Sequence, residues 1–118
     1  MDQIMLTIPS KAEYIIVVRL TLSGIAARCG FDFETIEDLK MAISEVFNLF
    51  NIEKISGQID IMFKIAREYL EIEIDILADE INQNELAEVI LKTLIDDIEF
   101  EKLQDKYIVR LKKYHRGV

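Results

Sequence analysis

Apolar and polar residues alternate along five stretches of the chain, and this period of two predicts β-strands that bury one face. In the clearest stretch, Leu70 to Leu77, apolar residues occupy one face, and Glu71, Glu73 and Asp75 occupy the other. The first stretch ends at Pro9, because proline cannot donate a hydrogen bond to a neighbouring strand. The predicted strands are Gln3 to Ile8, Gln58 to Ala66, Leu70 to Leu77, about Ile98 to Lys102 and about Lys106 to Tyr114.

The first of three predicted helices carries apolar residues on two sides. It begins at Ser10, where Ser10-x-x-Glu13 matches a capping box, and runs to about Cys29, with Gly30 as the residue that ends it. A helix that is apolar on two sides is usually covered on both, so the second side faces either the next helix or another subunit. The core stripe comprises Ile15, Val18, Leu22, Ile25, Ala26 and Cys29, and the second patch comprises Ile16, Leu20 and Ala27.

Two further helices follow from apolar residues at helical spacing. One runs from about Phe33 to Ile55, with Asp32 as its N-cap, and the other runs from about Asn84 to Asp96. The longer helix buries a stripe of Ile36, Leu39, Ile43, Val46, Phe47 and Phe50. The shorter helix packs through Leu86, Ile90, Leu91 and Leu94.

The order of these elements, β-α-α-β-β-α-β-β, predicts an α+β two-layer sandwich with helices on one face of a mixed or antiparallel sheet. Residues 1–118 contain no repeat, low-complexity segment or linker, which indicates a single domain. The length is sufficient to bury one core without disulfides or a structural metal.

Charge and composition narrow the possible partners. The net charge of −8 opposes binding to nucleic acid, because the phosphate backbone is also negative. The charge either favours basic proteins as partners or serves only to keep the protein soluble. No apolar run approaches the ~20 residues that span a bilayer, and no signal peptide is evident at the N-terminus. The single cysteine, Cys29, cannot form an internal disulfide and fits a reducing cytosol, so we expect a cytoplasmic protein.

Three segments carry a resemblance to a known family. They are Ile8 to Glu45, which includes VVRLTLSGIA and IEDLKMAISE, and TLIDDIEFE from Thr93 to Glu101. In order and sequence they resemble the anti-sigma-factor serine kinases, the RsbW/SpoIIAB-like family. The resemblance implies the two-layer fold of GHKL ATPases and a homodimer, formed through the N-terminal strand and first helix, that binds a sigma factor. It also implies phosphorylation of a serine on an antagonist protein with ATP and Mg²⁺.

The same resemblance suggests residues that contact protein partners. Arg19 matches an arginine that the family uses for such contacts, although an ordinary solvated arginine is an equal alternative. Glu13 lies earlier in the same helix and belongs either to that surface or to the capping box alone. The patch that includes Ile16 and Leu20 is compatible with the implied dimer.

The residues that would hold Mg²⁺ and begin catalysis depart from the family pattern. Glu45 occupies the position of the family's helix glutamate, but the asparagine expected four residues later is replaced by Leu49, which cannot ligate a hard cation. Asn48 comes one residue too early, which places it about 100° around the helix from the expected position. We therefore expect no metal site, and interpret Glu45 and Asn48 as parts of a solvated helix face.

The loops that would hold a nucleotide lack glycine. Either Asp79 or Asp75 matches the aspartate that reads adenine in this fold, and no glycine follows either residue. The segment before the third helix, residues 82–87, also lacks the glycine-rich turn that cradles phosphate and carries Glu85 near the helix start. The segment between Leu77 and Asn84 is too short for a lid over ATP. These losses predict that no cofactor is bound.

Three other features suggest chemistry only weakly. Cys29 lies on the apolar stripe and is interpreted as a core residue rather than a nucleophile. His115 has no nearby partner for a metal or catalytic role, and Lys112, Lys113, His115 and Arg116 form a small basic tail. The acidic row Glu71, Glu73 and Asp75 forms the wet face of the sheet rather than a cation site.

The leading hypothesis is a regulator that binds a sigma factor or an anti-anti-sigma antagonist, without ATP or kinase activity. The alternative is an active serine kinase that uses ATP and Mg²⁺ at an atypical site, with Glu45 as catalytic residue and Asn48 and Asp79 in cofactor binding. A third possibility is a domain whose only role is dimerisation.

Overall fold

The computed structural model describes residues 1–55, 57–82 and 84–115, and their order of helices and strands is the predicted one. Short 3-10 turns at Ala12–Tyr14 and Ile52–Lys54 precede α1 and follow α2. The elements are β1 (Asp2–Pro9), α1 (Ile15–Arg28), α2 (Phe33–Asn48), β2 (Gln58–Ile65), β3 (Tyr69–Leu77), α3 (Glu85–Leu94), β4 (Asp97–Leu103) and β5 (Lys106–Tyr114).

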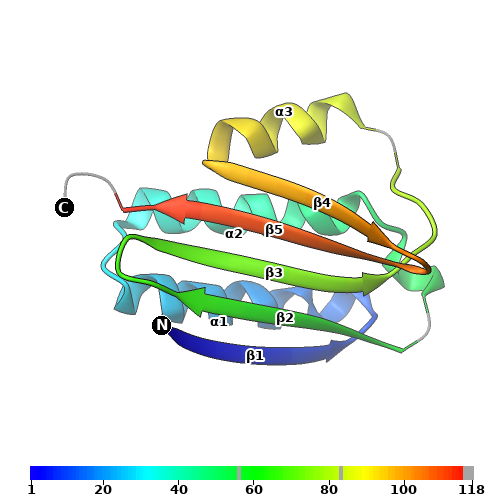
Figure 1. Cartoon of the computed structure of the whole chain (residues 1–118), viewed down its shortest axis with the longest axis horizontal. Helices are drawn as coiled ribbons and strands as arrows, with labels where there is room; N and C mark the ends of the chain where they lie inside the picture. The colour runs from blue at the N-terminus through cyan, green and yellow to red at the C-terminus, as the bar shows by residue number, and fades with distance from the viewer. Residues whose placement is uncertain (56, 83, 116–118) are drawn as a thin grey trace.

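The described strands form one five-stranded sheet in the order β1-β2-β3-β5-β4 (Figure 1). Every neighbouring pair is antiparallel, so the sheet is antiparallel rather than mixed. β1 and β4 are therefore the two edge strands, and β3 lies at the centre.

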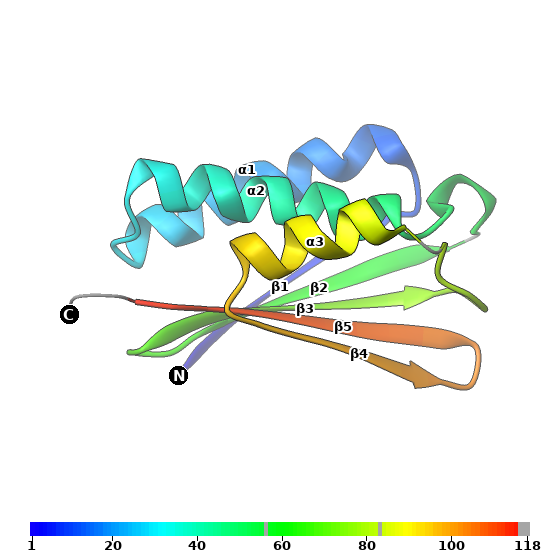
Figure 2. The same cartoon turned by 90° about the horizontal axis from the view of Figure 1, so that it is seen from above.

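The helices cover one face of the sheet and leave the other face open (Figure 2). Ile72, Ile74 and Ile76 of β3 are buried toward the helices, while the acidic residues between them lie on the open face. This arrangement confirms the alternation predicted from the sequence. No helix in the described part of the chain is long and apolar enough to cross a membrane.

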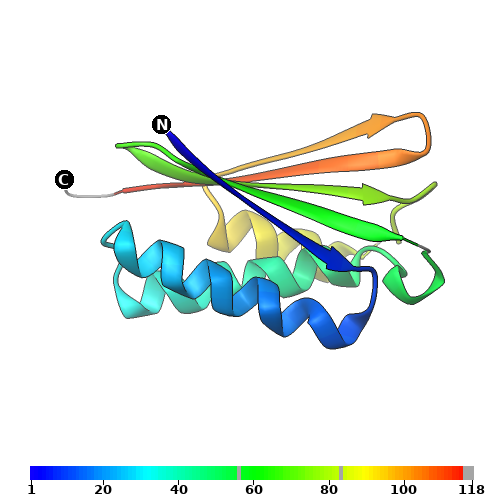
Figure 3. The same cartoon turned by 90° about the horizontal axis from the view of Figure 1, so that it is seen from below.

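The predicted apolar stripes of the first two helices form the core with the sheet. Val18, Leu22 and Ala26 of α1 are buried against α2 and the strands, and the α2 stripe from Leu39 to Phe47 joins the same cluster. In Figure 3, α1 lies at the front of the helix layer and β1 lies at the front of the sheet, while α3 lies at the back of the helix layer. The layers thus present α1 beside one sheet edge and α3 beside the other.

The predicted second helix is too long at its C-terminal end. α2 ends at Asn48 rather than Ile55, and the chain turns away at Leu49. The carbonyl of Leu49 accepts a hydrogen bond from the amide of Asn82 at 2.8 Å instead of continuing a helical ladder. A hydrogen bond from a distant segment thus replaces the next helical hydrogen bond. The spacing of apolar residues along the sequence cannot predict such a bond.

The predicted capping box at Ser10 is wrong. The Ser10 hydroxyl donates to the carbonyl of Ile52 at 2.8 Å, and its amide donates to the carbonyl of Gly57. α1 itself begins only at Ile15, after the 3-10 turn, and Tyr14 at its N-cap makes no side-chain capping bond. Ser10 therefore joins the end of β1 to the segment before β2, and Glu13 has no capping role.

The packing of the third helix differs from the prediction by one position. Leu91 is buried and Leu94 is partly buried, as expected, but Leu86 is 69% exposed and Ala87 is buried in its place. α3 lies at the rim of the helix layer, so one side of the helix has the sheet beneath it and the other faces solvent (Figure 2).

The turn after α1 depends on Gly30, as predicted. Its φ of 90° lies in the left-handed region, and its amide and that of Phe31 donate to the carbonyls of Ala27 and Ala26. These two bonds form a Schellman motif, which satisfies carbonyls at the helix end.

We expect Gly30→Ala to destabilise the protein by about 1–2 kcal/mol, because a side chain in the left-handed region is strained although no atom lies within 4 Å of the added Cβ. Gly24 is the matched control, since its Cβ would also meet no atom within 4 Å but it lies within α1. Gly24→Ala should stabilise the protein by about 0.5–1 kcal/mol. Urea denaturation measures both, and equal effects of the same sign would contradict this account.

Candidate functional site

The C-terminal half of α2 carries the first set of candidate residues. Glu45 is half-buried and Asn48 is exposed, whereas Leu49 is only 2% exposed and belongs to the core. Asn48 and Leu49 therefore point in different directions, and no local distortion of α2 brings Asn48 to the position of Leu49. The side chain at the expected metal position packs against other apolar groups and offers no oxygen to a cation.

The two aspartates that match the family's adenine-binding position lie in different places in the structure. Asp75 lies in β3 between the buried Ile74 and Ile76, so its carboxylate is on the open face, where it pairs with Lys106 at 3.1 Å. Asp79 follows the end of β3 and is exposed beside the end of α2. Of the two, only Asp79 is near the helix layer.

The segment after β3 is held at both ends. The Lys102 ammonium donates to the carbonyls of Ala78 and Asp79 at 3.1 and 2.9 Å, and the amide of Asn82 donates to Leu49. These bonds fasten the segment to the β4–β5 hairpin and to α2. They bring Asp79 and the end of α2 into one region, although Gln83 itself lies outside the described residues.

The N-terminus of α3 is already capped by the chain. The Asn84 side chain accepts a hydrogen bond from the Ala87 amide at 3.1 Å, and the Asn84 carbonyl accepts from the Glu88 amide. Glu85 and Glu88 add two carboxylates to the first turn. A helix N-terminus attracts an anion through free amides and a positive dipole, and here the cap and the carboxylates oppose both.

Sequence reasoning missed two residues of this region. The sequence pattern places Asn84 at the start of the third helix and in the segment without glycine but gave its side chain no capping role, although its position before an apolar helix is typical of an N-cap. Lys102 gave no signal at all, because its acceptors are carbonyls 23 and 24 residues away in the chain.

α1 presents the second set of candidates. Arg19 is half-buried, and its Nε atom is buried without a hydrogen-bond partner among the described residues. Ile16 and Leu20 are exposed, Leu20 to 64%, and Glu13 is exposed in the preceding turn. The sequence correctly separated this apolar patch from the core stripe, since α2 does not cover it.

An apolar groove of about 530 Å³ lies between α1 and the edge strand β1. Leu20 and Gly24 line it from the helix, and Ile4 lines it from the strand. Ile4 and Met5 are both exposed on β1. The patch of α1 is thus continuous with an unpaired sheet edge.

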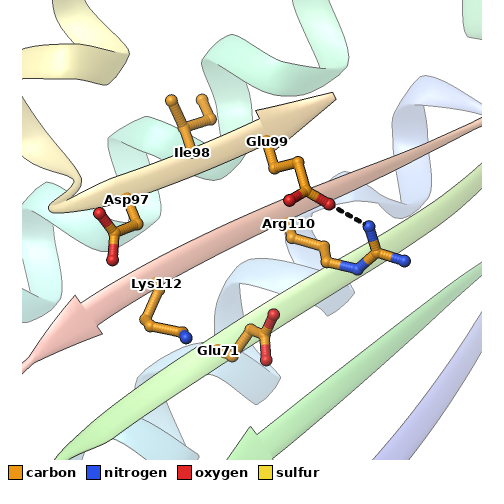
Figure 4. A pocket seen from close by; sticks show the side chains of 6 residues that line it. All are labelled: Glu71, Asp97, Ile98, Glu99, Arg110 and Lys112. Atoms are coloured by element: carbon orange, nitrogen blue, oxygen red, sulfur yellow. Dashed lines mark hydrogen bonds and ion pairs between the residues drawn. The ribbon is translucent and has the colours of Figure 1, made fainter. Parts of the chain in front are cut away.

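The acidic row on the open face forms ion pairs within the sheet, and Figure 4 shows the neighbouring pair of Arg110 and Glu99. Glu73 accepts from Lys64 at 2.9 Å and from Arg110 at 3.2 Å, and Arg110 also binds Glu99 and Glu101. Burial raises the pKa of Glu73, but the hydrogen bonds and charges of Lys64 and Arg110 outweigh it, so the pKa lies below its ordinary value. The row is therefore structural, and no cluster of metal-ligating side chains occurs within the described ranges.

Cys29 and His115 both pack against other parts of the fold. Burial raises the pKa of the Cys29 thiol, which reduces the fraction of reactive thiolate. The His115 ring stacks on Phe31 with 4.2 Å between centroids. The fourth member of the predicted basic tail, Arg116, lies outside the described residues.

Comparison with known proteins gives consistent relatives, although no family model matches the chain. The serine-protein kinase RsbW of Oceanobacillus iheyensis is 47% identical over 60% of this chain and 48% of its own length. The serine-protein kinase RsbW of Bacillus subtilis is 39% identical over 67% of this chain and 50% of its own length. In these relatives the match thus spans about half of their length. The serine-protein kinase RsbW of Bacillus cereus is 32% identical over 92% of this chain and 87% of its own.

The alignment with the Bacillus cereus protein covers 141 positions, more than the 118 residues of this chain. The aligned part of that relative therefore contains residues without a counterpart here.

Proposed function

The chain belongs to the RsbW family of serine-protein kinases, and from this membership we propose that it is a regulator that binds other proteins without holding ATP. Its partner is a sigma factor or the antagonist that competes for the same regulator, as in anti-sigma control. The observation that carries the proposal is the burial of Leu49, which stands at the position of the family's metal-ligating asparagine.

The region that would hold the phosphates supports the same conclusion. The α3 N-terminus has its Ala87 amide occupied by Asn84, and Glu85 and Glu88 place two negative charges where the phosphates would lie. Leu49 offers no ligand for the Mg²⁺ that would offset those charges. Phosphate and these exposed carboxylates would repel each other, so binding of a triphosphate is unfavourable.

We also assign the two-layer architecture to the GHKL ATPase fold, in which α2, the segment after β3 and α3 surround the nucleotide. Here that segment is tied to α2 through Asn82 and to β4 through Lys102. A segment held at both ends has little freedom to close over a ligand as a lid. The shorter chain relative to the Bacillus cereus protein is consistent with loss of such a lid.

The surface for the protein partner is α1 with the turn before it. Arg19 has a buried Nε without a partner, and a guanidinium in this state gains hydrogen bonds when a carboxylate or carbonyl of another protein approaches. Glu13 is exposed in the same region and offers a carboxylate to a basic side chain. The net charge of −8 favours a partner with a basic surface.

The groove between α1 and β1 is the surface for homodimerisation. Exposed Leu20 and Ile4 line it beside an unpaired strand edge, and Ile16 is exposed one turn before Leu20 on α1. A second copy would cover this patch in both molecules at once, as a two-fold symmetric interface requires.

Titration with a non-hydrolysable ATP analogue and Mg²⁺ tests whether the nucleotide site has been lost. We expect no heat of binding by calorimetry at millimolar analogue, because Leu49 offers no metal ligand and the first turn of α3 carries a capped amide and two carboxylates. The serine-protein kinase RsbW of Bacillus subtilis is the positive control. Micromolar binding by this chain would overturn the proposal and favour an active kinase that uses Glu45, Asn48 and Asp79.

Calorimetric titration against the sigma factors encoded by the source organism tests the partner. One of them should bind without nucleotide, and Arg19→Ala should weaken binding by about 1.5–3 kcal/mol, the value of a hydrogen bond to a charged group. Arg67→Ala, at an exposed position between β2 and β3, is the control and should leave the affinity unchanged. Absence of binding to every sigma factor would rule out the anti-sigma form of the proposal.

Light scattering tests the homodimer. Leu20→Asp should shift the mass from dimer to monomer, because each protomer would bury a carboxylate in an apolar groove. Met41→Asp provides the control, since Met41 is an exposed apolar residue on α2. An unchanged mass for Leu20→Asp would place the interface elsewhere.

A further inference from the structure

The sheet edge farthest from α1 carries a second groove, between α3 and β4. It has a volume of about 260 Å³ and is lined by Glu88, Leu91, Lys92, Ile98 and Phe100. In Figure 2, α3 lies in the helix layer at the end of the sheet formed by β5 and β4. The groove is thus open to solvent along the outer side of β4.

β4 is an edge strand with one free side. It pairs with β5 along its whole length, from Asp97 opposite Lys112 to Leu103 opposite Lys106, and has no strand on its other side. The outer side therefore presents backbone N–H and C=O groups to an incoming strand. The seven residues of β4 include no proline, the residue that most directly blocks strand addition.

Apolar side chains line the groove beside this free edge. Leu91 lines it from α3, and Ile98 and Phe100, the latter 37% exposed, line it from β4. A strand added to β4 would direct every second side chain toward the helix layer, where these residues lie. The groove therefore offers both backbone partners and apolar contacts, which is the combination used in recognition by strand addition.

We propose that an extended segment of a partner protein, with alternating basic and apolar residues, adds to β4 as a sixth strand. Its apolar side chains occupy the groove beside α3, and its basic side chains lie on the open face. This inference goes beyond the proposed function, because it involves neither α1 nor a nucleotide.

The charges on the open face select a basic segment. Asp97, Glu99 and Glu101 all lie on that face of β4, since Ile98 and Phe100 between them face the buried side of the sheet. A single guanidinium, that of Arg110, forms ion pairs with Glu99, Glu101 and Glu73 together. The outermost row therefore keeps negative charge, and cross-strand cations would stabilise an added strand.

The same charges disfavour a second copy of this chain at β4. If two β4 strands paired antiparallel with their helices on one side, the residues at positions 97, 99 and 101 of one copy would face those of the other. Carboxylates directly opposite one another destabilise a strand pair. The acidic row thus acts against self-pairing and in favour of a basic partner.

The test uses the full chain, labelled with ¹⁵N, and the blocked peptide Lys-Val-Lys-Ile-Lys-Val-Lys, which matches the length of β4. We expect saturable shifts of the amide resonances of β4 and α3, and slower hydrogen exchange along β4. A peptide with Glu in place of Lys should bind at least about tenfold more weakly, which is about 1.4 kcal/mol. A lysine peptide with a central proline should also bind weakly, because it cannot complete the strand.

Charge reversal in the acidic row of β4 provides a second readout. Glu99→Lys should weaken binding of the lysine peptide several-fold, and Glu34→Lys is the matched control, since Glu34 is likewise an exposed carboxylate but on α2. The proposal is overturned if the lysine peptide causes no shifts, shifts only α1 and β1, or binds no better than the glutamate or proline peptide. It is also overturned if Glu99→Lys lowers the oligomeric mass of the free chain, because a second copy would then occupy β4 in the native protein.

Discussion

The burial of Leu49 at the end of α2 is the constraint on which the rest of the site depends. Its side chain fills the core, and its carbonyl receives the amide of Asn82, so one residue ends the helix and fixes the segment that follows β3. A ligating side chain at this position would have to lie in an apolar interior without a partner, at a cost of roughly 1–3 kcal/mol. The same residue therefore completes the core, ends α2 and offers no oxygen ligand at this position.

The two edges of the sheet, β1 and β4, expose different kinds of side chain. Beside β1 the exposed side chains are apolar, with Leu20 and Ile4 on a shared groove, and this favours a symmetric partner such as a second copy. Beside β4 an apolar groove is combined with a row of carboxylates that share one arginine. Like charges oppose self-association there, so the protein has two sheet edges suited to different kinds of partner.

Most of the fold was predictable from the sequence because its signals are local. The alternation from Leu70 to Leu77, the Asp32 cap, whose carboxylate accepts from the Thr35 amide at 2.8 Å, and Gly30 at the end of α1 depend on neighbouring residues. The failures share one cause. Ser10 bonds to Ile52, Leu49 bonds to Asn82, and Leu86 lies at the rim of the helix layer, and each outcome depends on a segment distant in the chain.

The sequence by itself determined the order of the elements, the face of each strand that is buried, and the lack of glycine where a nucleotide loop would be. These properties are set by periodicity and by the conformational freedom of single residues. Only the tertiary structure decided that Asp75 pairs with Lys106, that the Asn82 amide donates to the Leu49 carbonyl, and that Lys102 fastens the segment after β3. Those contacts join residues that the folded sheet brings together, and their geometry exists only once the strands have paired.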